Sequence, residues 1–301
     1  MLIVFVQCSK DNKHSMEDEE IVKVSFSVGG EFSINESPLT KSSDDLVFGL
    51  SIFQDGVPFA NGVFDRIDNI NAFLKANHKY TFKCSLIKNG KQCLYYYNYG
   101  NYFHNPFQLV CSGASTTLSL ENKLNYKPGE YYLNLSAPSD YNSDNTYKYK
   151  ADRYYCEVYN YSPEENGSVI LNLKHTVIGL KYTVDGLSDG TLDILASLNG
   201  HWVFYETVSS NAESDELLLE CNDVLSAYNY PDTYTETASF RLKWHRGNNI
   251  DQDLGSVNVD LKRNMMNTVR IHLSSSNGNA QFGITQEVGD MTTDSVDVEV
   301  K

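Results

Sequence analysis

The 301-residue sequence predicts an all-β protein with two β-sandwiches in tandem. Apolar residues recur at every second position in many short segments, which is the period of a strand with one buried face. Turn-forming residues separate these segments, and no long stretch has the 3.6-residue period of a helix. Because the chain is long for a single sandwich, we expect two cores rather than one.

In the first half of the chain, alternating apolar residues mark the expected strands. The first of these lies in Ile21–Ile34, where Val22, Val24 and Phe26 alternate with polar residues. The later sets are Leu46, Phe48, Leu50 and Ile52, and then Tyr80, Phe82, Cys84 and Leu86. Asp55-Gly56 and Asn89-Gly90 predict tight hairpin turns, because these residue types tolerate a positive φ.

The same alternation restarts after a polar stretch over residues 136–145. The later sets are Val169, Leu171 and Leu173; Ile178, Leu180, Tyr182 and Val184; Phe240, Leu242 and Trp244; Val257, Val259 and Leu261; Val269, Ile271 and Leu273. Asp215–Leu225 is consistent with either a short helix or an apolar strand, and Leu217–Leu219 within it does not decide between them. We therefore expect a leader and acidic tether over 1–20, one sandwich over 21–160 and a second over 161–301.

The charge balance excludes several classes of protein. Lys plus Arg is 24 and Asp plus Glu is 39, so the net charge is 24 − 39 = −15. A general nucleic-acid binder needs a basic surface to displace counterions, and adsorption to anionic lipid needs one too. The mean hydropathy of −0.40 excludes a multi-span membrane protein. A hydrophobic fraction of 41% is enough for a packed core.

The N-terminus predicts a lipid anchor. An apolar run, Met1–Val6, is followed by Gln7 and Cys8, and a polar, charged stretch follows at once. This order is typical of the end of a lipoprotein signal, in which the cysteine carries the acyl chains, so Cys8 is the expected lipidation site. The run is too short to span a membrane. The alternative is an N-terminal strand with an ordinary cysteine.

The chemistry-bearing residues give no catalytic pattern. We find no zinc-protease, P-loop, nucleophile-elbow or dinucleotide-binding motif, and the seven histidines are scattered. Asp251 and Asp253 are spaced like calcium ligands, but the closing Glu is missing. We therefore expect no cofactor, no metal and no enzymatic activity. The many carboxylates leave an acid pair of the glycosidase type open.

A tyrosine-rich segment is the most unusual local feature. Seven of the ten residues in Leu94–Phe103 are aromatic or Leu. Exposed rings of this kind can stack on sugar faces or form a protein interface, whereas a strand–turn–strand could use them simply to cover the sandwich. The candidate binding residues are Tyr95, Tyr96, Tyr97, Tyr99, Tyr102 and Phe103.

The remaining cysteines are five in number, so they cannot all pair with one another. Cys84 and Cys93 flank the expected Asn89-Gly90 turn, so a disulfide across a hairpin is one alternative. Isolated buried thiols are the other. No pair has the spacing of a zinc site.

Several segments, taken in order, resemble Bacteroides-type fimbrillins, the subunits of type V pili. These segments are Ser37–Leu50, Asn61–Asp65, Asp152–Pro163, Asn166–Val169, Leu173–Lys181 and Leu261–Arg270. The resemblance implies two transthyretin-like, Greek-key sandwiches and export as a lipoprotein. It also implies assembly into a pilus or an accessory position on one.

The resemblance also implies a route of assembly. A surface protease cuts after a basic residue that follows the first strand, and a strand from another subunit fills the groove that the lost strand leaves. In this sequence the basic residue after Ile21–Ile34 is Lys41, although Arg is usual there. The alternative for Lys41 is a solvated loop residue. Ser295–Lys301 alternates valines with charges and is either a donor strand or an edge strand.

The predicted function is therefore a fimbrial subunit or pilus-accessory protein at the cell outer membrane, supporting adhesion. The expected partners are other pilus subunits bound through donor strands, the membrane lipid that anchors the chain, and a host or bacterial surface glycan or protein. No nucleic-acid partner is expected. The alternative is a cell-surface glycan-binding lipoprotein that uses the aromatic patch.

Overall fold

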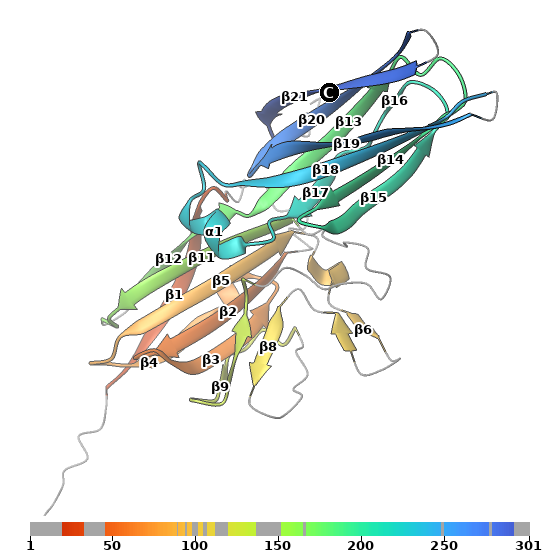
Figure 1. Cartoon of the computed structure of the whole chain (residues 1–301). Helices are drawn as coiled ribbons and strands as arrows, with labels where there is room; N and C mark the ends of the chain where they lie inside the picture. Colours follow the sequence, from red (N-terminus) through yellow and green to blue (C-terminus); the bar gives the residue numbers. More distant parts are fainter. Residues whose placement is uncertain are drawn as a thin grey trace, which may run out of the picture.

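The structure, a computed structural model, confirms the all-β prediction (Figure 1). It describes residues 20–32, 46–88, 90–93, 95–97, 102–104, 107–111, 120–136, 152–164, 167–247, 250–276 and 279–291. Across these ranges the elements are strands, two 3-10 turns and one α-helix, α1 (Val224–Asn229). None of the helices in the described ranges is both long and apolar enough to cross a bilayer.

The first sandwich contains an eight-stranded sheet in the order β4-β1-β12-β11-β5-β2-β3-β9. These strands are β4 (Asn71–Lys75), β1 (Ile21–Gly30), β12 (Ser168–His175), β11 (Asp152–Tyr161), β5 (Tyr80–Lys88), β2 (Val47–Gln54), β3 (Val57–Phe64) and β9 (Asn125–Tyr126). β11 and β12 are joined by only two residue pairs. The sheet folds at this narrow junction, so that β4, β1 and β12 pack over β5 and β2. The rings of Phe26 and Phe82 meet edge to face at 5.2 Å between the two layers.

The central strands β2 and β5 are covered on both faces. One face packs on the core that contains Phe26, and the other packs under the hairpin-like pair β8 (Gln108–Cys111) and β10 (Tyr131–Asn134). Phe107, Leu133 and Leu135 belong to this second cluster and are buried. A strand that is buried on both faces reads as a continuous apolar run, and six successive residues of β2 are buried.

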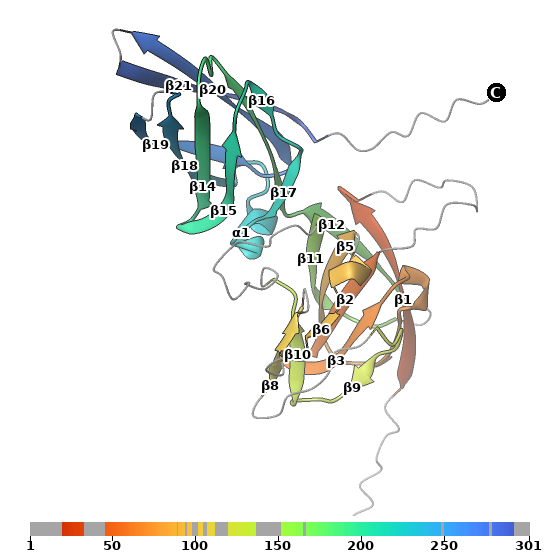
Figure 2. The ribbon, with the colours of Figure 1, turned by 90° about the vertical axis from the view of Figure 1, so that its right-hand side faces the viewer.

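The second sandwich has two sheets around one core (Figure 2). One sheet has the order β15-β14-β18-β19, with β15 (His201–Val208), β14 (Thr191–Leu198), β18 (Thr235–His245) and β19 (Asp251–Lys262). The other contains β13 (Val177–Asp185), β20 (Met265–Ser276) and β21 (Asn279–Asp290), with β16 (Ala212–Glu213) and β17 (Leu217–Glu220) paired to β13. The core between the sheets includes the fully buried Trp244, Phe240 and Leu242.

The chain passes from the first core to the second at Thr176, which lies between β12 and β13. Val169, Leu171 and Leu173 of β12 belong to the first core, although they follow residue 160. They do so because β12 pairs with β1 along its length. A division into domains at residue 160 stays a prediction, whereas the change of core in the structure falls at Thr176.

Two of the sequence-based turn predictions have different outcomes. Asp55 and Gly56, with φ of 50° and 83°, form the tight turn of the β2–β3 hairpin, as predicted. The Asn89-Gly90 hairpin is wrong, because β5 is followed by the 3-10 turn η2 (Gly90–Cys93) and pairs instead with β2 and β11. Cys84 lies opposite Cys156 as a free buried thiol, so a disulfide to Cys93 is not formed.

The ambiguous stretch Asp215–Leu225 contains a strand, Leu217–Glu220, and the first residues of a helix. The strand, β17, pairs with β13, and α1 begins only at Val224. Asp223 caps this helix, since its carboxylate accepts a hydrogen bond from the N–H of Ser226. Val224 packs against the first sandwich and Ala227 against the second, so α1 lies between the two (Figure 2).

The two tryptophans give a direct test of the second core. Trp244 is fully buried and its indole N–H donates to the carbonyl of Asp189 at 2.7 Å, whereas Trp202 is 44% exposed. We expect Trp244→Ala to lower the free energy of unfolding by about 3–5 kcal/mol through the cavity it leaves. Trp202→Ala is expected to cost about 1 kcal/mol or less. Urea denaturation measures both, and equal losses would contradict the assigned core.

Candidate functional site

Several residues that the sequence suggested for function lie outside the described part of the chain. Cys8, Lys41, Tyr99 and Ser295–Lys301 are among them. Of the aromatic patch, β6 (Tyr95–Tyr97) and β7 (Tyr102–His104) form a small antiparallel pair in which Tyr96 lies opposite Phe103. The side chains of this pair are outside the description, so the binding patch and the two processing sites stay predictions.

The candidate site in the described part of the chain is β1, the predicted first strand, together with the residues around it. It lies between β4 and β12 and uses both of its edges (Figure 1). From Ile21 to Ser25 it is antiparallel to β4, and from Ser25 to Gly30 it is parallel to β12. The segment is thus an inserted strand, not an addition at the rim of the sheet.

The burial of β1 follows the alternation that the sequence predicted. Val22, Val24 and Phe26 are at most 6% exposed and lie in the first core, while Lys23 and Ser25 between them are exposed. Phe32, just after the strand, is also buried and meets the ring of Tyr154 edge to face at 5.2 Å. Because each such side chain contributes roughly 1.5–3 kcal/mol on burial, the segment is a large part of this core.

The outer edge of the neighbouring strand β4 is already capped. The N–H of Phe73 donates to the hydroxyl of Tyr126 at 2.8 Å, and the N–H of Lys75 donates to the hydroxyl of Tyr80 at 2.9 Å. The Tyr80 hydroxyl in turn donates to the carbonyl of Lys75. Free edge groups are the usual site where another strand adds. A strand that added at the outer edge of β4 would have to displace these tyrosine hydroxyls.

At its C-terminal end β1 turns through a position that requires glycine. Gly30 has a φ of 82°, and a Cβ there would lie 2.5 Å from the carbonyl oxygen of Leu173. The next N–H, that of Glu31, donates to the same carbonyl at 2.8 Å. This tight approach to β12 directs the Glu31 side chain towards the second sandwich.

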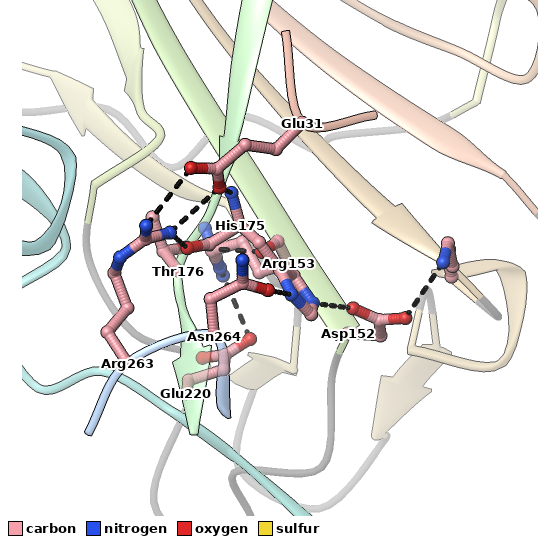
Figure 3. Close-up of polar contacts among 9 residues, drawn as sticks. Glu31, Asp152, Arg153, His175, Thr176, Glu220, Arg263 and Asn264 are labelled. Carbon is pink, nitrogen blue, oxygen red and sulfur yellow. Dashed lines mark hydrogen bonds and ion pairs between the residues drawn. The ribbon is translucent and has the colours of Figure 1, made fainter. Parts of the chain in front are cut away.

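Glu31 forms a bidentate ion pair with Arg263, the residue that follows β19 (Figure 3). The two guanidinium nitrogens, Nη1 and Nη2, donate to its two carboxylate oxygens at 2.8 and 3.0 Å. The N–H of His175 donates to the carboxylate as well, at 2.8 Å. Arg263 is only 3% exposed in its side chain, and it also donates to the carbonyls of Pro231 and His175. The side chain of Glu31, the residue that follows β1, therefore contacts both sandwiches.

A second ion pair, fully buried, lies nearby. Nε of Arg153 on β11 donates to Oε1 of Glu220 on β17 at 3.2 Å, and neither side chain is exposed. Arg153 also donates to the hydroxyl of Ser85 and the carbonyl of Leu135. The N–H of Thr176 donates to the carbonyl of Arg153. This pair joins a strand of each sandwich at the point where the chain crosses over.

His175 bonds to both members of the Glu31–Arg263 pair through its backbone, and the next residue, Thr176, bonds to Arg153. Its ring stacks on Tyr154 at 4.3 Å, with Nδ1 2.6 Å from Oδ1 of Asn264 and Nε2 in close contact with Asp152. Asp152 also pairs with Lys88 at 3.3 Å. Burial raises the pKa of Asp152, but the hydrogen bond and charge of His175 and the charge of Lys88 outweigh it, so the pKa lies below its ordinary value. We call this network the polar joint; its members are Glu31, Asp152, Arg153, His175, Thr176, Glu220, Arg263 and Asn264.

Two ion pairs of the polar joint connect the two sandwiches. Within the described ranges, no group of three or more His, Cys, Asp and Glu side chains is arranged to hold a metal ion. The Arg153–Glu220 and Glu31–Arg263 pairs each join the first half of the chain to the second sandwich, whereas the His175–Asp152 pair lies within the first sandwich. Sequence reasoning assigned no role to these residues, although Arg263 lies in a segment that carries the fimbrillin resemblance.

Comparisons with known proteins gave structural likenesses only. No family model matches the chain, and no curated protein matches it in sequence. The fimbrial anchor protein Mfa2 from Porphyromonas gingivalis is 10% identical with a TM-score of 0.41, over 90% of this chain and 99% of that one. The tip fimbrial protein Mfa3 from the same organism, with a C-terminal truncation, is 9% identical with a TM-score of 0.36, over 90% and 100%. A candidate adhesin from Bacteroides ovatus is 10% identical with a TM-score of 0.44, over 91% and 96%.

The Glu31–Arg263 pair predicts a specific pH dependence of stability. Partial burial raises the pKa of Glu31. The hydrogen bonds and charge of Arg263 and the N–H of His175 outweigh this effect, so the pKa lies below its ordinary value. A carboxylate whose folded pKa is depressed stabilises the fold above its unfolded pKa of 4.5, and this contribution is lost as the pH falls through the folded value. We expect Glu31→Gln to lower the free energy of unfolding by about 2 kcal/mol at pH 7. The effect is no larger because a third of the Glu31 side chain is exposed, so that solvent screens the pair.

Urea denaturation between pH 7 and pH 3 tests this expectation. The gap between Glu31→Gln and the unsubstituted chain should shrink as the pH falls below 4.5, where the carboxyl of the unfolded chain becomes protonated. It should close only below the lowered pKa of the folded chain, where the Glu31 carboxyl is neutral in both states. Glu20→Gln, at an exposed position, is the matched control. A gap that keeps its size down to pH 3 would show that the ionised carboxylate is not responsible.

The buried Arg153–Glu220 pair gives a second prediction. Arg153→Met removes the cation that bonds to a fully buried carboxylate, and we expect a loss of about 3–5 kcal/mol. The double variant Arg153→Met, Glu220→Leu should be more stable than Arg153→Met alone, because no charge then remains at this position. The free energies of unfolding measure the difference. A double variant that loses the sum of the two single losses would contradict the coupling.

Proposed function

We propose that the chain is a fimbrial or adhesin-like cell-surface protein that joins other subunits by exchanging β1 for a partner strand. The observation that carries this proposal is the position of β1: it is paired on both edges, buried on one face, and sits beside a strand whose outer edge is capped. A strand of this kind leaves a defined groove when it is removed. The ordered sequence segments that resemble fimbrillins support the same conclusion.

The proposed route begins at the N-terminus. Cys8 carries the lipid that holds the chain at the outer membrane, and Lys41 is the processing site between β1 and β2. Cleavage there frees β1 at its C-terminal side. The core face that Val22, Val24 and Phe26 cover is then exposed, with unpaired backbone groups on β4 and β12 at its sides.

The groove left by β1 determines the properties of the strand that can fill it. Backbone hydrogen bonds to β4 and β12 provide sequence-independent affinity, and alternating apolar side chains fix the register. A groove of this kind also favours aggregation, so its exposure has to be coupled to the arrival of a partner. The uncut chain keeps β1 in place and remains a monomer until processing.

Controlled removal of β1 tests the proposal. A specific protease site replaces part of residues 35–45 in the full chain, and cleavage is followed by mild urea to release the β1 fragment. We expect multimers that survive SDS without boiling and collapse on boiling. The uncleaved chain, and cleaved chain kept with excess peptide of residues 20–32, should stay monomeric. A chain that loses β1 and remains a monomer of unchanged thermal stability would rule out strand exchange.

Processing at the cell surface gives a complementary test. An unboiled SDS gel of the native surface fraction should show a ladder at regular multiples of the chain mass. Lys41→Ala should leave a single lipidated band, because β1 is then not released. Cys8→Ala should remove the chain from the membrane fraction. A ladder that is unchanged in Lys41→Ala would place the processing site elsewhere.

A further inference from the structure

We propose that Arg263 selects the strand that replaces β1, accepting segments with a carboxylate at the position of Glu31. This inference rests on the strand exchange proposed above and adds the chemistry of the partner. The partner is an extended segment of another polypeptide with apolar residues at the positions of Val22, Val24 and Phe26, then glycine, an acidic residue and an aromatic one. Arg263 is thus a specificity-determining residue at the end of the groove.

The guanidinium of Arg263 is held in place by groups that remain when β1 leaves. Its Nε donates to the carbonyl of Pro231 at 2.7 Å, and Nη1 contacts the carbonyl of His175. The backbone N–H of Arg263 donates to the carbonyl of Tyr234. None of these partners belongs to the first segment. The cation therefore stays at the end of the groove, with two of its donors aimed at the position that Glu31 occupied.

Among the described residues, Glu31 is the carboxylate that bonds to this guanidinium. Arg263 is 3% exposed while the segment is bound, so a neutral residue at the position of Glu31 would leave a buried cation with only carbonyl partners. A charge buried in this way is costly unless an anion is nearby. An incoming strand that brings a carboxylate removes that cost, and one that brings a neutral or basic residue does not.

The geometry also separates a carboxylate from its neutral isostere. Three N–H groups converge on the two oxygens of Glu31: Nη1 and Nη2 of Arg263 and the backbone N–H of His175. Glutamine offers one oxygen, and its NH₂ group would face these donors. A site built from converging donors discriminates against a ligand that leaves a donor unpaired.

Neighbouring positions fix where the acid has to lie. Gly30, immediately before it, has a φ of 82° and lies against the carbonyl of Leu173, so a side chain is excluded there. Phe32, immediately after it, is buried against Tyr154. The acid therefore falls five residues after the last of the three alternating apolar positions, and a one-residue shift would move it out of reach.

Peptide exchange into the cleaved full chain tests this selection. After cleavage between β1 and β2, the β1 fragment is displaced by fluorescein-labelled peptides of residues 20–32, and their dissociation is followed by fluorescence anisotropy. The Glu31→Gln peptide should dissociate at least about tenfold faster than the native peptide, and Glu31→Lys faster still. The Glu20→Gln peptide has the same change of charge at an exposed position and should behave like the native one.

The chain itself provides the reciprocal variant. With Arg263→Gln in the receiving chain, the native and Glu31→Gln peptides should dissociate at rates within about twofold of each other, because the discriminating cation is gone. If the native and Glu31→Gln peptides leave the unsubstituted chain at equal rates, selection by Arg263 is overturned and strand exchange stands. If no peptide enters the groove at all, strand exchange fails, and the selection that rests on it fails too.

Discussion

The first sandwich buries its core only while a strand lies between β4 and β12. β1 fills that position with three buried apolar side chains and with backbone pairing on both edges. A strand paired on one edge only could be lost with limited damage to its neighbours. Removal of β1 instead exposes apolar surface and separates β4 from the rest of the sheet. The stability of this half of the molecule therefore depends on one short segment near the N-terminus.

The same segment reaches the second sandwich through Glu31. Ionic contacts inside a protein are poor sources of net stability, because desolvation offsets much of their attraction. They are effective at fixing orientation, since an unpaired charge in the same place is strongly unfavourable. The Arg153–Glu220 and Glu31–Arg263 pairs thus define how the two sandwiches meet, while the apolar cores on either side supply the driving force for folding.

Tyrosine has a structural role that helps to explain its abundance in this chain. The hydroxyls of Tyr126 and Tyr80 occupy the outward backbone groups of β4. Natural sheets protect their edges against unplanned pairing in several ways, and side-chain capping of this kind has the same effect. Tyr228 of α1 packs its ring on Tyr155 of β11 and donates its hydroxyl to the carbonyl of Glu157. These rings act as polar anchors inside apolar surroundings, because each combines a large apolar face with one donor.

Much of the architecture was accessible from the sequence. The period-two alternation of Val22, Val24 and Phe26 predicted a strand with one buried face, and the Asp55-Gly56 pair predicted the β2–β3 hairpin. These features are local, since side-chain periodicity and a positive φ are set by neighbouring residues. The prediction of a hairpin at Asn89-Gly90 was wrong because a local signal cannot tell whether the chain that follows pairs with the strand before the turn.

By itself, then, the sequence determined the all-β class, the places of many strands and the buried face of β1, because these follow from short-range patterns. Only the tertiary structure decided which strands pair, that β12 belongs with the first core, and that Glu31 meets Arg263 across 232 residues of sequence. Contacts of this kind arise when two surfaces dock, and their partners carry no periodicity that marks them beforehand. The physical reason is that a salt bridge depends on where two charged groups lie in space. The pairing of distant strands sets these positions, and local sequence patterns do not encode them.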